Sequence, residues 1–147
     1  MRRVGIVGAG IAVLALATAG AGAADYIGAA KCKMCHKLQY DSWATLKHAK
    51  AFDVLKAEEQ TDAKCLKCHA TGGKADLPGV QCEACHGAGS GYKAMDVMKS
   101  REASVAAGLV VPDEATCKSC HVGAPHDQKP FDYATALAAG VHQHKQP

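Results

Sequence analysis

Cys32-Lys33-Met34-Cys35-His36 is the first of four Cys-x-x-Cys-His motifs in this chain of 147 residues. The other three occupy residues 65–69, 82–86 and 117–121, and the four motifs together use all eight cysteines. Residues three apart lie on one side of a helical turn, so the two thiols of each motif can reach the same edge of a flat ligand. The histidine that follows then points beneath that ligand.

The motif is typical of covalent haem c attachment, in which two thiols add to the porphyrin vinyl groups and the histidine binds the iron from one face. The sequence therefore predicts four covalently attached haem c groups and no catalytic residue. The attachment residues are Cys32, Cys35, Cys65, Cys68, Cys82, Cys85, Cys117 and Cys120, and the proximal iron ligands are His36, His69, His86 and His121.

Three other uses of paired cysteines account for less of the pattern. Eight thiolates could fill two structural zinc sites, but the histidine after every pair would then be a coincidence. Disulfides suit an exported chain, yet cysteines three apart in a helical turn rarely bridge each other. A thioredoxin-like redox pair belongs near a strand–helix–strand unit, and nothing in the sequence indicates one.

The N-terminus has the pattern of a secretory signal peptide. Arg2 and Arg3 precede an apolar run rich in alanine and glycine, and small residues follow at 21–24. This pattern predicts a signal peptide at 1–24 and one haem-binding domain at 25–147. The run is short and glycine-rich for a membrane span, which leaves an uncleaved anchor as the alternative. Export predicts a periplasmic protein, and an extracellular location is the alternative.

The mature chain is too small to bury a large core of its own, because only about 123 residues follow the expected cleavage site. We therefore expect a mostly α-helical multihaem fold in which the haems form the core, with short helices, long loops and little or no β-structure. The formal net charge of +3 falls to +1 without Arg2 and Arg3. Two propionates on each haem would make the holoprotein negative, so nothing supports nucleic-acid binding.

Apolar spacing and turn residues predict the remaining elements. A helix is expected over 38–59 and another over 92–107, with a loop at 71–79 between them. Pro112-Asp113-Glu114 predicts the start of the short helix that carries the fourth motif. A last helix is expected over 132–141.

Four histidines remain as candidates for the second axial position of the irons: His48, His126, His142 and His144. His48 lies on the first expected helix, twelve residues after His36. Such a helix spans about 18 Å, so His48 is expected to bind the haem of another motif. One of His142 and His144 is an expected ligand, with His142 favoured because it continues the last helix. His126 follows His121 so closely that it can bind only a neighbouring haem.

Other side chains are weaker candidates for contact with the haems. Met95 and Met98 carry possible axial sulfurs, although helix packing is their more ordinary use. Four aromatic side chains are expected to pack against haem edges: Trp43, Phe52, Phe131 and Tyr133.

Several longer stretches carry a family resemblance. They are Tyr26-Ile27-Gly28 before the first motif, residues 43–52 with Trp43 and His48, Gly79-Val80-Gln81 before the third motif, and Pro130-Phe131-Asp132-Tyr133 with His142-Gln143-His144. On these residues the chain resembles the cytochrome c-554 family of tetrahaem c-type cytochromes. The resemblance implies a monomeric, mostly α-helical fold with closely packed haems, periplasmic electron transfer, and His48 as a distal ligand to another motif's haem. It also implies a five-coordinate haem at Cys65, Cys68 and His69.

The chain departs from the family pattern in two places. The type member has a distal histidine shortly after its third motif, whereas residues 92–98 here contain none. His126 stands where the type member has no obvious counterpart. The distal ligands are therefore expected to be rearranged. The chain is also shorter, so the hydroxylamine-oxidising partner of nitrifier members is not implied.

The sequence predicts an electron-transfer protein that works between respiratory redox proteins, without nucleic acid and with membrane contact only through an uncleaved signal segment. One alternative is a reductase acting on a nitrogen oxide at an open haem, which needs proton donors that are not visibly placed. A second alternative is a subunit of a haem filament, in which a terminal histidine binds a neighbouring subunit's haem.

If the haems form the core, the chain without them should not fold. We expect the haem-free mature chain, produced without haem attachment, to lack a cooperative thermal transition in circular dichroism and to be digested rapidly by protease. The holoprotein is the control and should resist the same digestion. A folded, protease-resistant haem-free chain would contradict the prediction.

Overall fold

The computed structural model describes residues 23–123, 126 and 130–144. Residues 1–22, which make up most of the predicted signal peptide, lie outside them. The described residues form eight short α-helices and three 3-10 turns, and two isolated bridges, from Ala70 to Pro78 and to Gly79, are the nearest approach to β-structure within them. The prediction of a mostly α-helical fold is confirmed.

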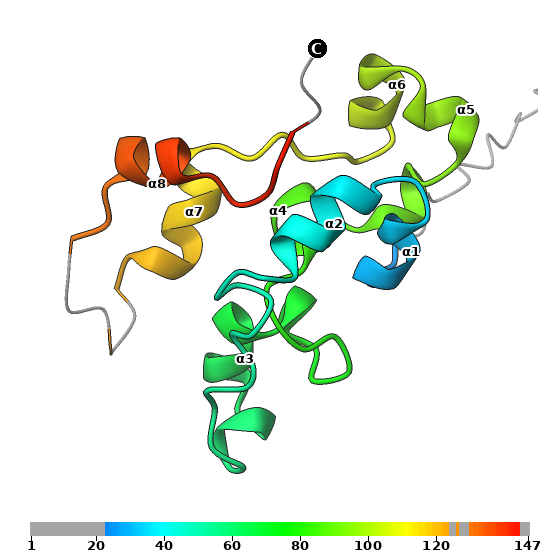
Figure 1. The fold of residues 1–147 in the computed structure, drawn as a ribbon. Coiled ribbons are helices and arrows are strands. Elements are labelled where there is room, and N and C mark those ends of the chain that lie inside the picture. The colour runs from blue at the N-terminus through cyan, green and yellow to red at the C-terminus, as the bar shows by residue number, and fades with distance from the viewer. Residues whose placement is uncertain (1–22, 124–125, 127–129, 145–147) are drawn as a thin grey trace, which may run out of the picture.

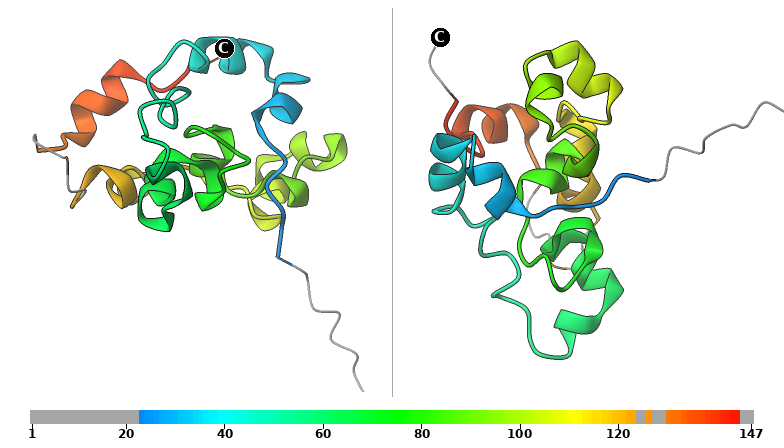
Figure 2. Two further views of the ribbon diagram at one scale, coloured as in Figure 1. Left: turned by 90° about the horizontal axis from the view of Figure 1, so that it is seen from below. Right: turned by 90° about the vertical axis from the view of Figure 1, so that its right-hand side faces the viewer.

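The helices are α1 (Ala29–Lys33), α2 (Lys37–Trp43), α3 (Ala63–His69), α4 (Cys82–His86), α5 (Met95–Met98), α6 (Arg101–Ala106), α7 (Glu114–His121) and α8 (Tyr133–Ala139). The 3-10 turns are η1 (Glu59–Thr61), η2 (Thr71–Gly73) and η3 (Gly89–Gly91). The helix α3 lies at one end of the molecule and the α5–α6 pair at the other, with α1, α2 and α4 between them (Figures 1 and 2).

Each motif lies on a short helix, as its spacing requires. The helices α3, α4 and α7 end at the histidine of their motif, and the first motif extends α1 by one turn through a hydrogen bond from His36 N to Cys32 O of 2.9 Å. The predicted start of α7 is confirmed by a capping box. Asp113 accepts a hydrogen bond from Thr116 N at 2.9 Å while its own N–H donates to the Thr116 hydroxyl.

The helix predicted over 38–59 is wrong beyond Trp43. Residues 44–55 instead form consecutive turns, which carry His48 off any helix. Long-range hydrogen bonds hold this path: the Trp43 indole donates to Val80 O at 2.8 Å, and Val80 N donates to His48 O at 2.9 Å. Gly79 permits this approach, because a Cβ at that position would stand 2.6 Å from Ala49 O.

The other two predicted helices are shorter than expected. Residues 92–107 divide into α5 and α6, because Ser100 stops the first helix and caps the second by accepting from Ala103 N. The last helix ends at Ala139, since Gly140 takes a positive φ of 73°. His142 therefore follows the helix rather than continuing it.

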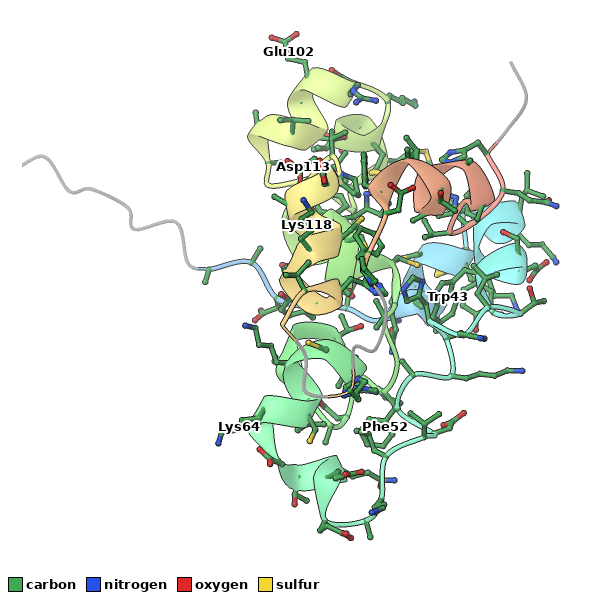
Figure 3. All side chains as sticks on the ribbon, turned by 90° about the vertical axis from the view of Figure 1, so that its left-hand side faces the viewer. Trp43, Phe52, Lys64, Glu102, Asp113 and Lys118 are labelled. Atoms are coloured by element: carbon green, nitrogen blue, oxygen red, sulfur yellow. The ribbon has the colours of Figure 1, made fainter. Side chains whose placement is uncertain are left out.

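The peptide has almost no apolar core of its own. Among the described residues the buried hydrophobic side chains are Ala29, Leu66, Ala70 and Tyr92. Ten large apolar side chains are exposed, including Met95 at 69% and Leu137 at 65%. The side chains of Trp43 and Phe52 lie among other segments of the chain, whereas those of Lys64 and Glu102 project outward (Figure 3). So much uncovered apolar surface indicates a fold completed by apolar groups other than its own side chains.

The best-buried large side chain is a carboxylate, that of Glu83, which is 1% exposed and lies inside the third motif. It accepts hydrogen bonds from Ile27 N at 2.9 Å, Gly28 N at 2.7 Å and Gly89 N at 2.6 Å. Backbone donors and a charged acceptor make strong bonds in a buried place. Glu83 thereby holds the segment before the first motif, and the turn after the third, against α4.

Replacing this carboxylate should destabilise the whole protein. In Glu83→Gln an amide N–H₂ group would face backbone donors that cannot accept, and leaving such donors unsatisfied costs about 1–3 kcal/mol each. We expect a lower free energy of unfolding in denaturant for the haem-loaded variant. Glu102→Gln on the exposed end of the molecule is the matched control and should change it by less than about 0.5 kcal/mol. Equal stability of the two variants would refute the role of Glu83.

Candidate functional site

Three of the four motif histidines have oriented rings. His69 Nδ1 lies 2.6 Å from Ala51 O, and His86 Nδ1 lies 3.1 Å from Val110 O. A carbonyl only accepts, so each Nδ1 is the protonated nitrogen and Nε2 keeps its lone pair for a metal. The ring of His121 is instead stacked on Phe131, with centroids 4.8 Å apart and an interplanar angle of 19°.

The same three rings each face a second histidine from a distant part of the chain. His48 lies opposite His121 with ring centroids 5.9 Å apart. His126 lies opposite His69 at 5.6 Å. His142 lies opposite His86 at 6.2 Å. The sequence singled out all of these histidines, and the tertiary structure brings them together in these pairs.

The spacing of the pairs suits an iron between the two rings. A metal–imidazole bond of about 2 Å and a ring radius of about 1.1 Å put two ligating ring centres roughly 6 Å apart on opposite sides of the metal. The three observed separations lie close to that value. Each pair therefore fits a haem iron bound from both faces.

The other two histidines are placed differently. The ring of His144 lies against that of His142, with centroids 4.5 Å apart, and faces no motif histidine at ring-contact distance. His36 is exposed and has no ring contact with any described residue, and the described residues include all eight histidines.

Contacts between their helices join the four motifs into a continuous spatial series, and η2, which follows the second motif, also packs on α4. The thiols of Cys32 and Cys82 interact, and α1 packs on α4. Cys85 lies within electrostatic range of both cysteines of α7. The helix α7 in turn packs on α3, which carries the second motif. The helices that carry the four motifs therefore lie next to one another in the molecule (Figure 1).

Burial favours the ligand form of the paired histidines. It lowers the pKa of His48, and the neighbouring His121 lowers it further. Burial also lowers the pKa of His86, against the opposing effect of its hydrogen bond to Val110 O. A histidine must be neutral to bind a metal, so both shifts favour binding.

The thiols of the motifs respond differently to their surroundings. Burial raises the pKa of Cys85 to about 11. A hydrogen bond from Cys32 lowers the pKa of Cys82 to about 7 and raises that of Cys32 itself.

The alternatives to haem find no support in the described residues. No three histidine, cysteine or acidic side chains there converge as a metal-ion site requires. The cysteines of the first, third and fourth motifs are thiols and not disulfides. Paired histidines, paired thiols on helical turns and uncovered apolar side chains all fit haem c instead.

Comparison with known proteins agrees with this chemistry. The family model described as cytochrome c554 and c-prime matches residues 31–87. The chain is 30% identical to cytochrome c-554 of Nitrosomonas europaea over 157 aligned positions, which cover 80% of this chain and 66% of that protein. The chain belongs to the cytochrome c-554 family. No solved structure matches it significantly.

Membership makes this chain a c-type cytochrome that binds haem c covalently. It spans 66% of the length of its relative, so the relative's properties do not transfer as a whole. Among the described residues, no helix combines the length and apolar character that a bilayer crossing demands.

Some residues of the site carried no signal in the sequence. The carbonyls of Ala51 and Val110 orient two histidines, and a backbone oxygen has no residue type that reveals it. The role of Glu83 was also missed. Its position between two cysteines that anchor the same ligand was the available clue. The anchored cysteines hold the side chain between them in one place, so it must contact a neighbouring segment of the chain.

Proposed function

We propose that the mature chain, residues 25–147, is an exported periplasmic cytochrome that holds four haem c groups and carries electrons between two redox proteins. The continuous series of motifs carries this proposal. Porphyrins attached to neighbouring motifs must lie close together, and electrons can then pass along them without a substrate pocket. The first motif, whose Cys35 and His36 are exposed, is a natural point for electrons to enter or leave.

The proposal includes the axial ligands. The proximal ligands are the four motif histidines, and the distal ligands are His126 for the second motif, His142 for the third and His48 for the fourth. Each pairing rests on a ring separation near 6 Å. An iron between two imidazoles is low-spin and changes its ligands little on reduction, which suits rapid one-electron transfer.

Reductive titration tests the electron-carrier proposal. The holoprotein, titrated anaerobically while its haem absorbance is followed, should take up four electrons per chain reversibly and return to its starting spectrum on reoxidation. Uptake of fewer than four, or irreversible bleaching of any haem, would contradict the proposal.

The ligand assignment at the fourth motif has its own test. In His48→Met a thioether replaces one imidazole, and His/Met ligation raises the potential of a haem relative to its bis-histidine form. We expect one of the four one-electron steps to move to higher potential in spectroelectrochemistry. Lys47→Met, at the exposed neighbouring position, is the control and should leave all four steps unchanged. Unchanged steps in the His48 variant would show that His48 binds no iron.

A further inference from the structure

The first motif differs from the other three in its surroundings. The rings of His69, His86 and His121 are half-buried and each faces a second histidine, whereas His36 is exposed and faces none. The His36 ring also makes no hydrogen bond or stacking contact within the described residues, although it lies close enough to His86 to interact with it electrostatically.

The remaining histidine is already committed elsewhere. His144 packs against His142 at 4.5 Å, and both lie within electrostatic range of His86, the histidine of the third motif. It therefore stands beside an existing pair and makes no ring contact with His36.

The methionine sulfurs provide no evident substitute. Met34 stands between the two cysteines that hold the same porphyrin edge, so its sulfur cannot cross to the far face of that ring, and its side chain is 79% exposed. Met95 and Met98 both lie on α5, which packs chiefly on α6, and Met95 is 69% exposed.

The motif is also open to solvent. Cys35 and His36 are exposed, while the corresponding cysteines and histidines of the other motifs are half-buried. The four motifs belong to one structure, so the difference in solvent exposure between them comes from the fold. A small molecule in solution can reach the first motif most directly.

We propose that the iron bound through His36 has a sixth position that no protein side chain occupies, and that in the ferrous state this position binds a neutral diatomic molecule. The inference rests on the proposed function, which places a haem at each motif. It moves the open haem to the first motif, away from His69, where the resemblance implied one and where His126 now lies. Binding is simple coordination, so no bond breaks and no electron is transferred.

Carbon monoxide is the probe. The holoprotein, fully reduced with dithionite under anaerobic conditions, is titrated with carbon monoxide and followed by the change in its Soret absorbance. We expect one carbon monoxide per chain. An uptake of zero overturns the inference. It is the result expected if Met95, Met98 or His144 binds the iron at its sixth position. Because four-electron uptake is measured separately, such a result leaves the electron-carrier proposal standing.

Three variants assign the site by elimination. His48→Ala, His126→Ala and His142→Ala each remove one facing ring, so each should raise the uptake from one carbon monoxide to two. His144→Ala is the matched histidine control and should leave it at one. If one of the first three variants still binds a single molecule, its iron was the open one in the native protein, and the assignment to His36 is wrong.

A second measurement, made on the native protein, tests the inference even if the variants lose their haems or misfold. The electron paramagnetic resonance spectrum of the oxidised native holoprotein should show one high-spin iron for every three low-spin irons. Four low-spin irons would overturn the inference without any variant.

Discussion

With four buried hydrophobic side chains among its described residues, the polypeptide supplies too little apolar surface to hold itself together. Its helices are short and its long connections turn repeatedly, so neither secondary structure nor side-chain packing explains a defined fold. The haems that membership of the family implies supply the missing surface, and eight thioether links would also restrict the unfolded chain. We therefore expect folding and cofactor binding to be one process in this protein, as in small metal-dependent domains.

Polar interactions then decide where the haem-bearing segments lie. The carboxylate of Glu83 draws the backbone at 27 and 28 to α4, which places the first motif beside the third. The Val110 backbone bonds to His86 through both its N–H and its carbonyl, which leads the chain from the third motif to the fourth. The placement of the first, third and fourth motifs thus follows from a few hydrogen bonds that join residues of the third motif to segments outside it.

The four sites are unequal, and the inequality bears on function. Two motif histidines donate to a backbone carbonyl, which makes the imidazole a stronger electron donor to the iron, while a third is held by aromatic stacking and the fourth is unrestrained. Such differences spread the potentials of otherwise identical haems. Under the proposed ligation, the exposed first motif would hold a haem that differs from the rest in both ligation and access.

The sequence by itself determined the cofactor chemistry, because a thiol pair three residues apart followed by histidine is a local pattern that survives without knowledge of the fold. The predominance of helix and the start of α7 at Asp113 followed from equally local rules. Only the tertiary structure decided which histidines meet. His48 was expected on a helix that long-range bonds to Val80 replace with turns, and His142 lies beyond the helix that Gly140 ends. The histidine ring contacts join residues up to 73 positions apart, such as His48 and His121, and no local sequence pattern reveals a contact made at that separation.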